Sequence, residues 1–194
     1  IVSLPSDNRK FDMFLDYVTG EEIVVLDNYF YTSEYHKRIK AKGCKLVHID
    51  DVHDRHFHVD MIINHGNATP DMYDVEPFTK FCLGPSYALL RGPFLSPAPC
   101  ISKSDGKWVV CFGGSDPQNL TEKAVIALSL RDDVNQITAI VGDLYASKEA
   151  LLDCGKVTVL SSLSADEMAA QYSSAEYVLC SASSVCYEAL ACGC

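Results

Sequence analysis

The sequence lacks the features of several large classes of protein. No apolar run in its 194 residues approaches the roughly 20 residues that a membrane-spanning helix needs, and no signal peptide opens it. Positive charge is not in excess: the formal charge of −10 argues against a nucleic acid or an anionic membrane as the main partner. The nine cysteines include no C-x-x-C pair, and several fall in strand-like runs, where free cysteine behaves as a small apolar residue. We therefore predict a cytoplasmic protein with reduced cysteines.

Apolar runs alternate with helical patterns along most of the chain. Strands are predicted at residues 23–26, 45–49, 61–63, 108–112, 137–141, 157–160 and 177–180, and helices at 33–42, 117–130, 148–152 and 165–173. Nearly continuous apolar strands separated by helices are typical of parallel sheets that are covered on both faces. The sequence therefore predicts an α/β protein.

The best candidate for a linker is a proline-dotted stretch in the middle of the chain. Pro93, Pro97 and Pro99 interrupt any regular element there, so we place a domain boundary near residue 100. The expected arrangement is an N-terminal Rossmann-like domain at 1–100 and a C-terminal Rossmann-like domain at 101–194. In such folds ligands bind at the carboxyl ends of the strands, and we expect a cleft there.

A glycine-rich turn follows the strand predicted at 108–112. Gly113 and Gly114 leave the backbone bare, so that a phosphate can approach amide groups at a helix N-terminus. Pro117 suits the first helical position, and Ser115 or Asp116 can cap the helix. Taken alone, the same residues also fit an ordinary strand-to-helix turn.

A second loop of the same kind lies near the C-terminus. Ser181, Ser183 and Ser184 supply hydroxyl groups and a helix N-cap after the strand at 177–180. Glu188 then lies about one turn into the next helix, where a carboxylate can accept hydrogen bonds from the two hydroxyls of a ribose. A serine-capped helix with Glu188 interacting with the helix dipole is the alternative. The presence of both loops favours a nucleotide site.

Several motifs along the chain resemble those of a known enzyme family. They are Asp27-Asn28-Tyr29, Ile49-Asp50-Asp51, and the segments 60–64, 83–91, 112–121 and 181–188. In order and spacing the chain closely resembles the UDP-2,4-diacetamido-2,4,6-trideoxy-β-L-altropyranose hydrolases of pseudaminic acid biosynthesis. These hydrolases are similar in fold to the lipid II N-acetylglucosaminyltransferase, a GT-B enzyme. The resemblance implies two Rossmann-like domains in a GT-B-like arrangement and hydrolysis of a UDP-linked amino-deoxy sugar at its anomeric carbon, without cofactor or metal.

The resemblance also implies roles for single residues. Gly113, Gly114 and Ser115 would contact the sugar or the pyrophosphate, and Ser183 and Ser184 would contact phosphate. Glu188 would bind the ribose of uridine. Tyr29 would have a catalytic role, and Asp51 is expected to face the sugar. Two positions depart from the family pattern. Asn28 replaces a histidine, and Tyr187 replaces a polar residue that often precedes the family glutamate.

The family's proposed catalytic histidine lies in a Gly-x-Gly-His loop, which residues 1–194 do not contain. We therefore expect a fragment, truncated at both ends, that begins downstream of this loop and is inactive alone.

Three other functions remain open at this point. A glycosyltransferase would bind UDP in the same way, and so would a sugar-nucleotide binding module without catalytic activity. A metal-dependent hydrolase is the third, because His56, His58 and Asp60 alternate as metal ligands do on one strand face. For the His/Asp-rich segment 48–60 we favour a polar loop with solvated histidines and turn-forming Asp50 and Asp51.

Overall fold

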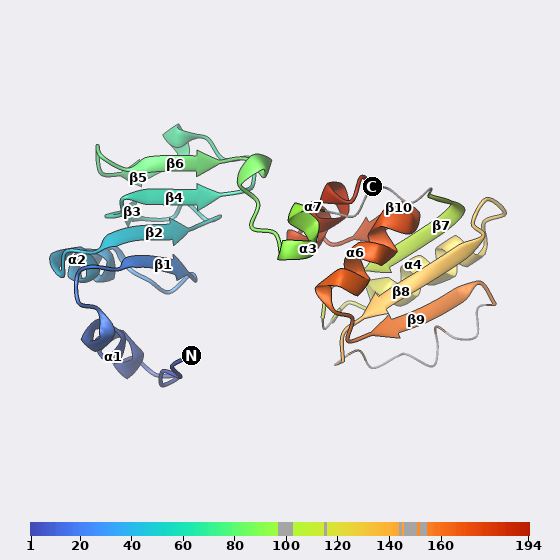
Figure 1. The fold of residues 1–194 in the computed structure, drawn as a ribbon, viewed down its shortest axis with the longest axis horizontal. Helices are drawn as coiled ribbons and strands as arrows, with labels where there is room; N and C mark the ends of the chain where they lie inside the picture. Colours follow the sequence, from blue (N-terminus) through green and yellow to red (C-terminus); the bar gives the residue numbers. More distant parts are fainter. Residues whose placement is uncertain (97–102, 115, 144, 146–150, 152–154) are drawn as a thin grey trace. The chain divides into compact units, whose positions relative to one another are not determined.

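The computed structural model describes residues 1–96, 103–114, 116–143, 145, 151 and 155–194 (Figure 1). It divides the chain into two compact units, Ile1–Ala88 and Leu89–Cys194. Each unit is built around a parallel sheet with helices packed on it (Figure 1). The α/β class predicted from the sequence is confirmed. The helix predicted at 148–152 lies largely outside the described residues.

The first unit contains short helices and strands that follow one another closely. They are α1 (Arg9–Tyr17), β1 (Ile23–Asp27), α2 (Ser33–Ala41), β2 (Lys45–Ile49), β3 (His56–Phe57), β4 (Met61–Asn64), η1 (Pro70–Met72), β5 (Asp74–Val75), β6 (Lys80–Leu83) and η2 (Pro85–Tyr87). A four-stranded parallel sheet has the order β1-β2-β4-β6, and β3 pairs separately with β5.

Helices cover one face of this first sheet. Val24 and Leu26 point into a core that also contains Tyr35 and Ile39 of α2. Strand residues alternate between the two faces of a sheet, and Ile23 and Val25, on the other face, are 70% and 55% exposed. At β1, an edge strand, the expected cover is therefore found on one face only, because α1 and α2 both pack into the same core.

Two histidines are buried together in the core of the first unit. His36 of α2 and His48 of β2 are 0% and 2% exposed, and a hydrogen bond of 3.0 Å joins His36 Nε2 to His48 Nδ1. Burial lowers the pKa of both rings, that of His36 to about 3. Both imidazoles are therefore neutral at neutral pH. The prediction that the histidines of segment 48–60 are solvated is wrong for His48, whose side chain alternates into the core with that of Leu46.

The second unit has helices on both faces of its sheet. Its elements are α3 (Gly92–Leu95), β7 (Ser104–Cys111), α4 (Leu120–Ser129), β8 (Gln136–Val141), β9 (Val157–Ser161), α6 (Ala165–Ser174), β10 (Ala175–Cys180) and α7 (Ser184–Ala191). The described strands form a parallel sheet in the order β10-β7-β8-β9. Val109 packs in one core with residues of α3, α6 and α7, while Val110 packs in another core with residues of α4 (Figure 1).

The division between the units falls before the proline-dotted stretch. The sequence placed it near residue 100, whereas the second unit begins at Leu89. The reason is that α3 packs on the second unit: Phe94 is 1% exposed and lies in the core with Tyr172 and Ala189. Pro97 and Pro99 lie outside the described residues.

None of the described helices combines the length and apolar character that crossing a membrane requires. Within the described part of the chain, the cysteines without a disulfide are Cys44, Cys82, Cys111, Cys180, Cys186, Cys192 and Cys194.

The histidine pair predicts how the stability of the first unit depends on pH. Unfolded His36 takes up a proton near its ordinary pKa of 6.5, whereas the folded ring resists protonation down to about pH 3. Stability is therefore complete above about pH 6.5 and falls on acidification. We expect His36 alone to remove about 2 kcal/mol of unfolding free energy between pH 7 and pH 5, and His48 to add to this loss.

Denaturant unfolding at several pH values measures the effect. A His36→Gln variant retains an amide near the position of Nε2 but does not titrate, so its stability should depend less on pH over this interval. If the unfolding free energy of His36→Gln changed with pH as steeply as that of the wild type, the account would be contradicted.

Candidate functional site

A cavity of about 320 Å³ opens in the second unit, at the carboxyl ends of its strands. The residues that line it come mainly from the loops after β7, β8 and β9 and from the start of α7. They are Arg91, Cys111, Gly113, Gly114, Ile140, Val141, Gly142, Asp143, Ser162, Leu163, Met168, Ser184, Val185 and Glu188. Four of the sequence-predicted site residues are among them: Gly113, Gly114, Ser184 and Glu188.

The strand order explains why the cavity forms at this place. The chain runs from β7 outward through β8 to β9, and then returns to place β10 on the other side of β7. The loops after β7 and β10 consequently diverge at their carboxyl ends. In open α/β sheets such a topological switch point is where ligands bind.

Glu188 is buried in the wall of this cavity and paired with an arginine. Its side chain is 6% exposed, and Arg91 Nε and Nη2 donate to its two carboxylate oxygens at 2.7 and 2.8 Å. Glu188 raises the pKa of Arg91 above its ordinary value, so that the guanidinium is charged. The pairing was missed from the sequence, because 97 positions separate the two residues.

The glycine turn after β7 lies against a third glycine, Gly142. Gly113 has a φ of +88°, which favours glycine, and a Cβ atom on Gly114 would meet nothing within 4 Å. A Cβ on Gly142 would lie 1.8 Å from the carbonyl oxygen of Gly114. The backbone after β8 thus packs directly on the backbone of the turn. The sequence signal for Gly142 was its place immediately after the strand predicted at 137–141.

The helix after the glycine turn begins later than predicted. α4 starts at Leu120, not at Pro117. The carboxylate of Asp116 accepts hydrogen bonds from the backbone N–H groups of Leu120 and Thr121, at 2.9 and 2.8 Å. Asp116 therefore caps the helix as expected, although it lies four residues before the first helical residue. It occupies N–H groups that were expected to be available to a phosphate. Ser115 lies outside the described residues.

The serines of the second loop have different positions. Both Ser183 and Ser184 are exposed, but Ser184, the first residue of α7, lines the cavity, whereas Ser183 is the N-cap residue and does not. The hydroxyl groups of Ser183 and Ser181 lie 2.9 Å apart. The first N–H groups of a helix have no partner within it, so the start of α7 gives this side of the cavity a positive character.

Tyr29 and Asp51 lie together in a separate cavity of the first unit. This cavity has a volume of about 220 Å³ and is lined by Asp27, Asn28, Tyr29, Ile49, Asp50, Asp51 and His65, after β1 and β2. The Tyr29 hydroxyl donates to Asp51 Oδ2 at 3.2 Å. Chiefly through its charge, Asp51 raises the pKa of Tyr29, so the phenol is protonated at neutral pH. Asp50 turns the chain as expected, accepting from the N–H of His53 at 3.0 Å.

Asp60 does not join His56 and His58. Its Oδ2 atom accepts from Lys40 Nζ at 2.5 Å and from the N–H of Leu46 at 2.8 Å. The carboxylate thus ties α2 and β2 to the start of β4. The alternating ladder of His56, His58 and Asp60 considered from the sequence is therefore not formed.

Among known proteins, a distant relative of the chain comes from an archaeon. The chain is similar to the uncharacterized protein MJ1062 of Methanocaldococcus jannaschii, with 26% identity over 140 residues. The match covers 67% of this chain and 29% of that protein, so the chain spans less than a third of the relative's length. No protein-family model matches the chain.

The close packing of Gly142 predicts the effect of a single methyl group. Gly142→Ala should displace the Gly113–Gly114 turn and lower the unfolding free energy of the second unit by about 1–3 kcal/mol, as overpacking does. Gly114→Ala is the matched control, since its Cβ meets nothing within 4 Å. It should lower the unfolding free energy much less. Denaturant unfolding followed by circular dichroism compares the two. Equal stability of both variants would show that the turn does not pack on Gly142.

Proposed function

We propose that the cavity of Leu89–Cys194 binds the uridine diphosphate part of a nucleotide sugar, and that the protein hydrolyses the anomeric C1–O bond of a UDP-linked amino-deoxy sugar. The observation that carries the proposal is a buried carboxylate, Glu188, at a cavity that Gly113, Gly114 and Ser184 also line. A carboxylate can accept hydrogen bonds from the ribose hydroxyls, and backbone amides at a helix N-terminus can bind the phosphates. The resemblance of the motifs to a family of UDP-sugar hydrolases adds support.

Glu188 is suited to hold the ribose even though it is paired. A carboxylate has two oxygens with about four acceptor positions, and Arg91 occupies one on each oxygen, through Nε and Nη2. The other positions are free in principle to accept two adjacent hydroxyl groups. The guanidinium also fixes the orientation of the carboxylate, which reduces the entropy lost on binding.

The diphosphate would meet groups of complementary charge. The first turn of α7, beginning at Ser184, offers N–H groups and the positive end of the helix dipole at the cavity, and the guanidinium of Arg91, whose charge Glu188 balances, adds N–H donors. These groups are local, so a protein with a net charge of −10 can still bind an anion. They would also stabilise the charge that develops on the leaving UDP.

The proposed reaction is a substitution by water. Water attacks the anomeric carbon, the C1–O bond breaks with its electron pair passing to UDP, and a base accepts the proton of the water. The protonated Tyr29 phenol is a hydrogen-bond donor and not that base. From the resemblance we propose a catalytic role for Tyr29, as a hydrogen-bond donor, and a position facing the sugar for Asp51.

The role of Glu188 predicts which ligand loses affinity when the carboxylate is removed. UDP should bind the wild-type chain. Glu188→Ala should lower the affinity for UDP by at least about tenfold, since hydrogen bonds to charged groups contribute about 1.5–3 kcal/mol each. The affinity for 2′,3′-dideoxy-UDP, which lacks both hydroxyls, should change little. Isothermal titration calorimetry measures both ligands.

Two variants control this experiment. Glu188→Gln keeps an acceptor for Arg91, and its affinity for UDP should lie between those of the wild type and Glu188→Ala. Asp166 lies on α6 and does not line the cavity, so Asp166→Asn should bind UDP with the affinity of the wild type. If Glu188→Ala lost the same affinity for UDP as for its dideoxy analogue, Glu188 would not bind the ribose hydroxyls. Unchanged UDP affinity in folded Glu188→Ala would reject the site.

Dependence on an acceptor separates hydrolysis from glycosyl transfer. The native gene product, given a UDP-linked amino-deoxy sugar in buffer alone, should release UDP and the free sugar in equal amounts. Chromatography of the products measures this release. Strict dependence on an added sugar or lipid acceptor would identify a transferase, and UDP binding without any turnover would identify a binding module.

A further inference from the structure

The short strands β3 and β5 bring two histidines and two carboxylates onto one surface. In their parallel pairing His56 lies opposite Asp74, and Phe57 lies opposite Val75. Phe57 is fully buried, and alternate residues of a strand face opposite ways. His56 and His58 therefore share the outer face of the ribbon with Asp74 and Glu76.

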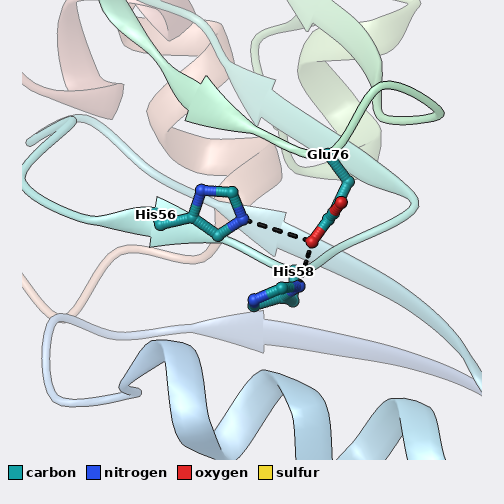
Figure 2. Close-up of side chains that lie close together, drawn as sticks. All are labelled: His56, His58 and Glu76. Atoms are coloured by element: carbon teal, nitrogen blue, oxygen red, sulfur yellow. Dashed lines mark hydrogen bonds and ion pairs between the residues drawn. The ribbon is translucent and has the colours of Figure 1, made fainter.

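Three of these side chains converge on a common point, as Figure 2 shows. Glu76 Oε1 lies 3.3 Å from His56 Nε2 and also contacts His58 Nδ1. One ligand atom from each of His56, His58 and Glu76 lies within 4.8 Å of the other two. A zinc ion bonded at about 2.0–2.1 Å to each of three ligand atoms holds them roughly 3.3 Å apart. Small side-chain rotations thus suffice to form such a site.

A fourth residue sets the tautomer that metal binding requires. Asp74 Oδ1 lies 2.8 Å from His56 Nδ1, so the proton of the neutral ring belongs on Nδ1 and the lone pair on Nε2. Nε2 is the atom that faces Glu76. A metal-bound histidine characteristically donates its other N–H to a carboxylate in this way. The contact is therefore independent support for a metal site, beyond the clustering of the three ligands.

We propose that His56, His58 and Glu76 bind a zinc ion, with Asp74 orienting His56. Two imidazoles and one carboxylate favour zinc over magnesium or calcium, which prefer oxygen ligands alone. The three side chains are 33%, 24% and 24% exposed, which leaves an approach for the ion and a coordination position for water. The ion would join β3 to the segment that follows β5 and so stabilise the first unit. This proposal does not rest on the function proposed for Leu89–Cys194.

A zinc titration of the whole chain, with the cysteines kept reduced, tests the site. Calorimetry should detect zinc binding that His56→Ala and Glu76→Gln each weaken by at least about tenfold, and that Asp74→Asn weakens by roughly 10–100-fold, as loss of an orienting partner does. Zinc should also raise the thermal unfolding temperature of the wild type and not of His56→Ala. His65→Ala, a histidine outside the cluster, should bind zinc like the wild type.

Cobalt(II) supplies a second readout, because the chain has nine cysteines that compete for soft metals. Cobalt at the proposed site should give visible bands without a thiolate charge-transfer band. Zinc binding of the same strength in folded His56→Ala and Glu76→Gln, or a thiolate band that both variants retain, would place the metal on cysteines and reject the site. Absence of zinc binding by the wild type would reject it as well. Loss of UDP-sugar turnover on zinc removal, by contrast, would count against the proposed metal-free hydrolysis and leave the binding site intact.

Discussion

Parallel pairing of the strands is the constraint on which the described features depend. In a parallel sheet all strands run in one direction, so the loops after their carboxyl ends gather at one edge. In the second unit this rule places the loops after β7, β8 and β9 around one cavity. In the first unit it places the loops after β1 and β2 around another. The same geometry aligns His56 with Asp74 in the ribbon of β3 and β5.

The main charged groups in the cavity of the second unit are the ion pair of Arg91 and Glu188. A buried carboxylate without a partner costs several kcal/mol, and the two-point contact of the guanidinium offsets that cost. The pair also connects the beginning of the second unit to α7, the last helix of the described chain. The ion pair that orients this carboxylate for a polar ligand thus also stabilises the unit.

The sequence predicts β1, β2, β4, β7, β8, β9 and β10, because buried parallel strands are short apolar runs with clear ends. It misses β6 and the two-residue strands β3 and β5. It predicts Gly113, Gly114, Ser184 and Glu188 for one site because the first three lie in or directly after loops that follow strands, and Glu188 lies about one turn into the helix after β10. It does not predict contacts between distant residues. Arg91 pairs with a residue 97 positions away, and Glu76 replaces Asp60 beside the histidines because Lys40 and the N–H of Leu46 already engage Asp60. The start of α4 was misplaced because Asp116 reaches amides several residues ahead, with Asn119 in the left-handed region.

The central claim is that the cavity of the second unit is a site for uridine diphosphate. Nuclear magnetic resonance of the ¹⁵N-labelled chain, titrated with UDP, tests it most directly. The account predicts that the largest shifts occur at Gly113, Gly114, Gly142 and Ser184, whose backbone groups line the cavity, with amides of Ile1–Ala88 far less affected. Shifts that are absent at saturating UDP, or that are confined to residues outside this cavity, would contradict it.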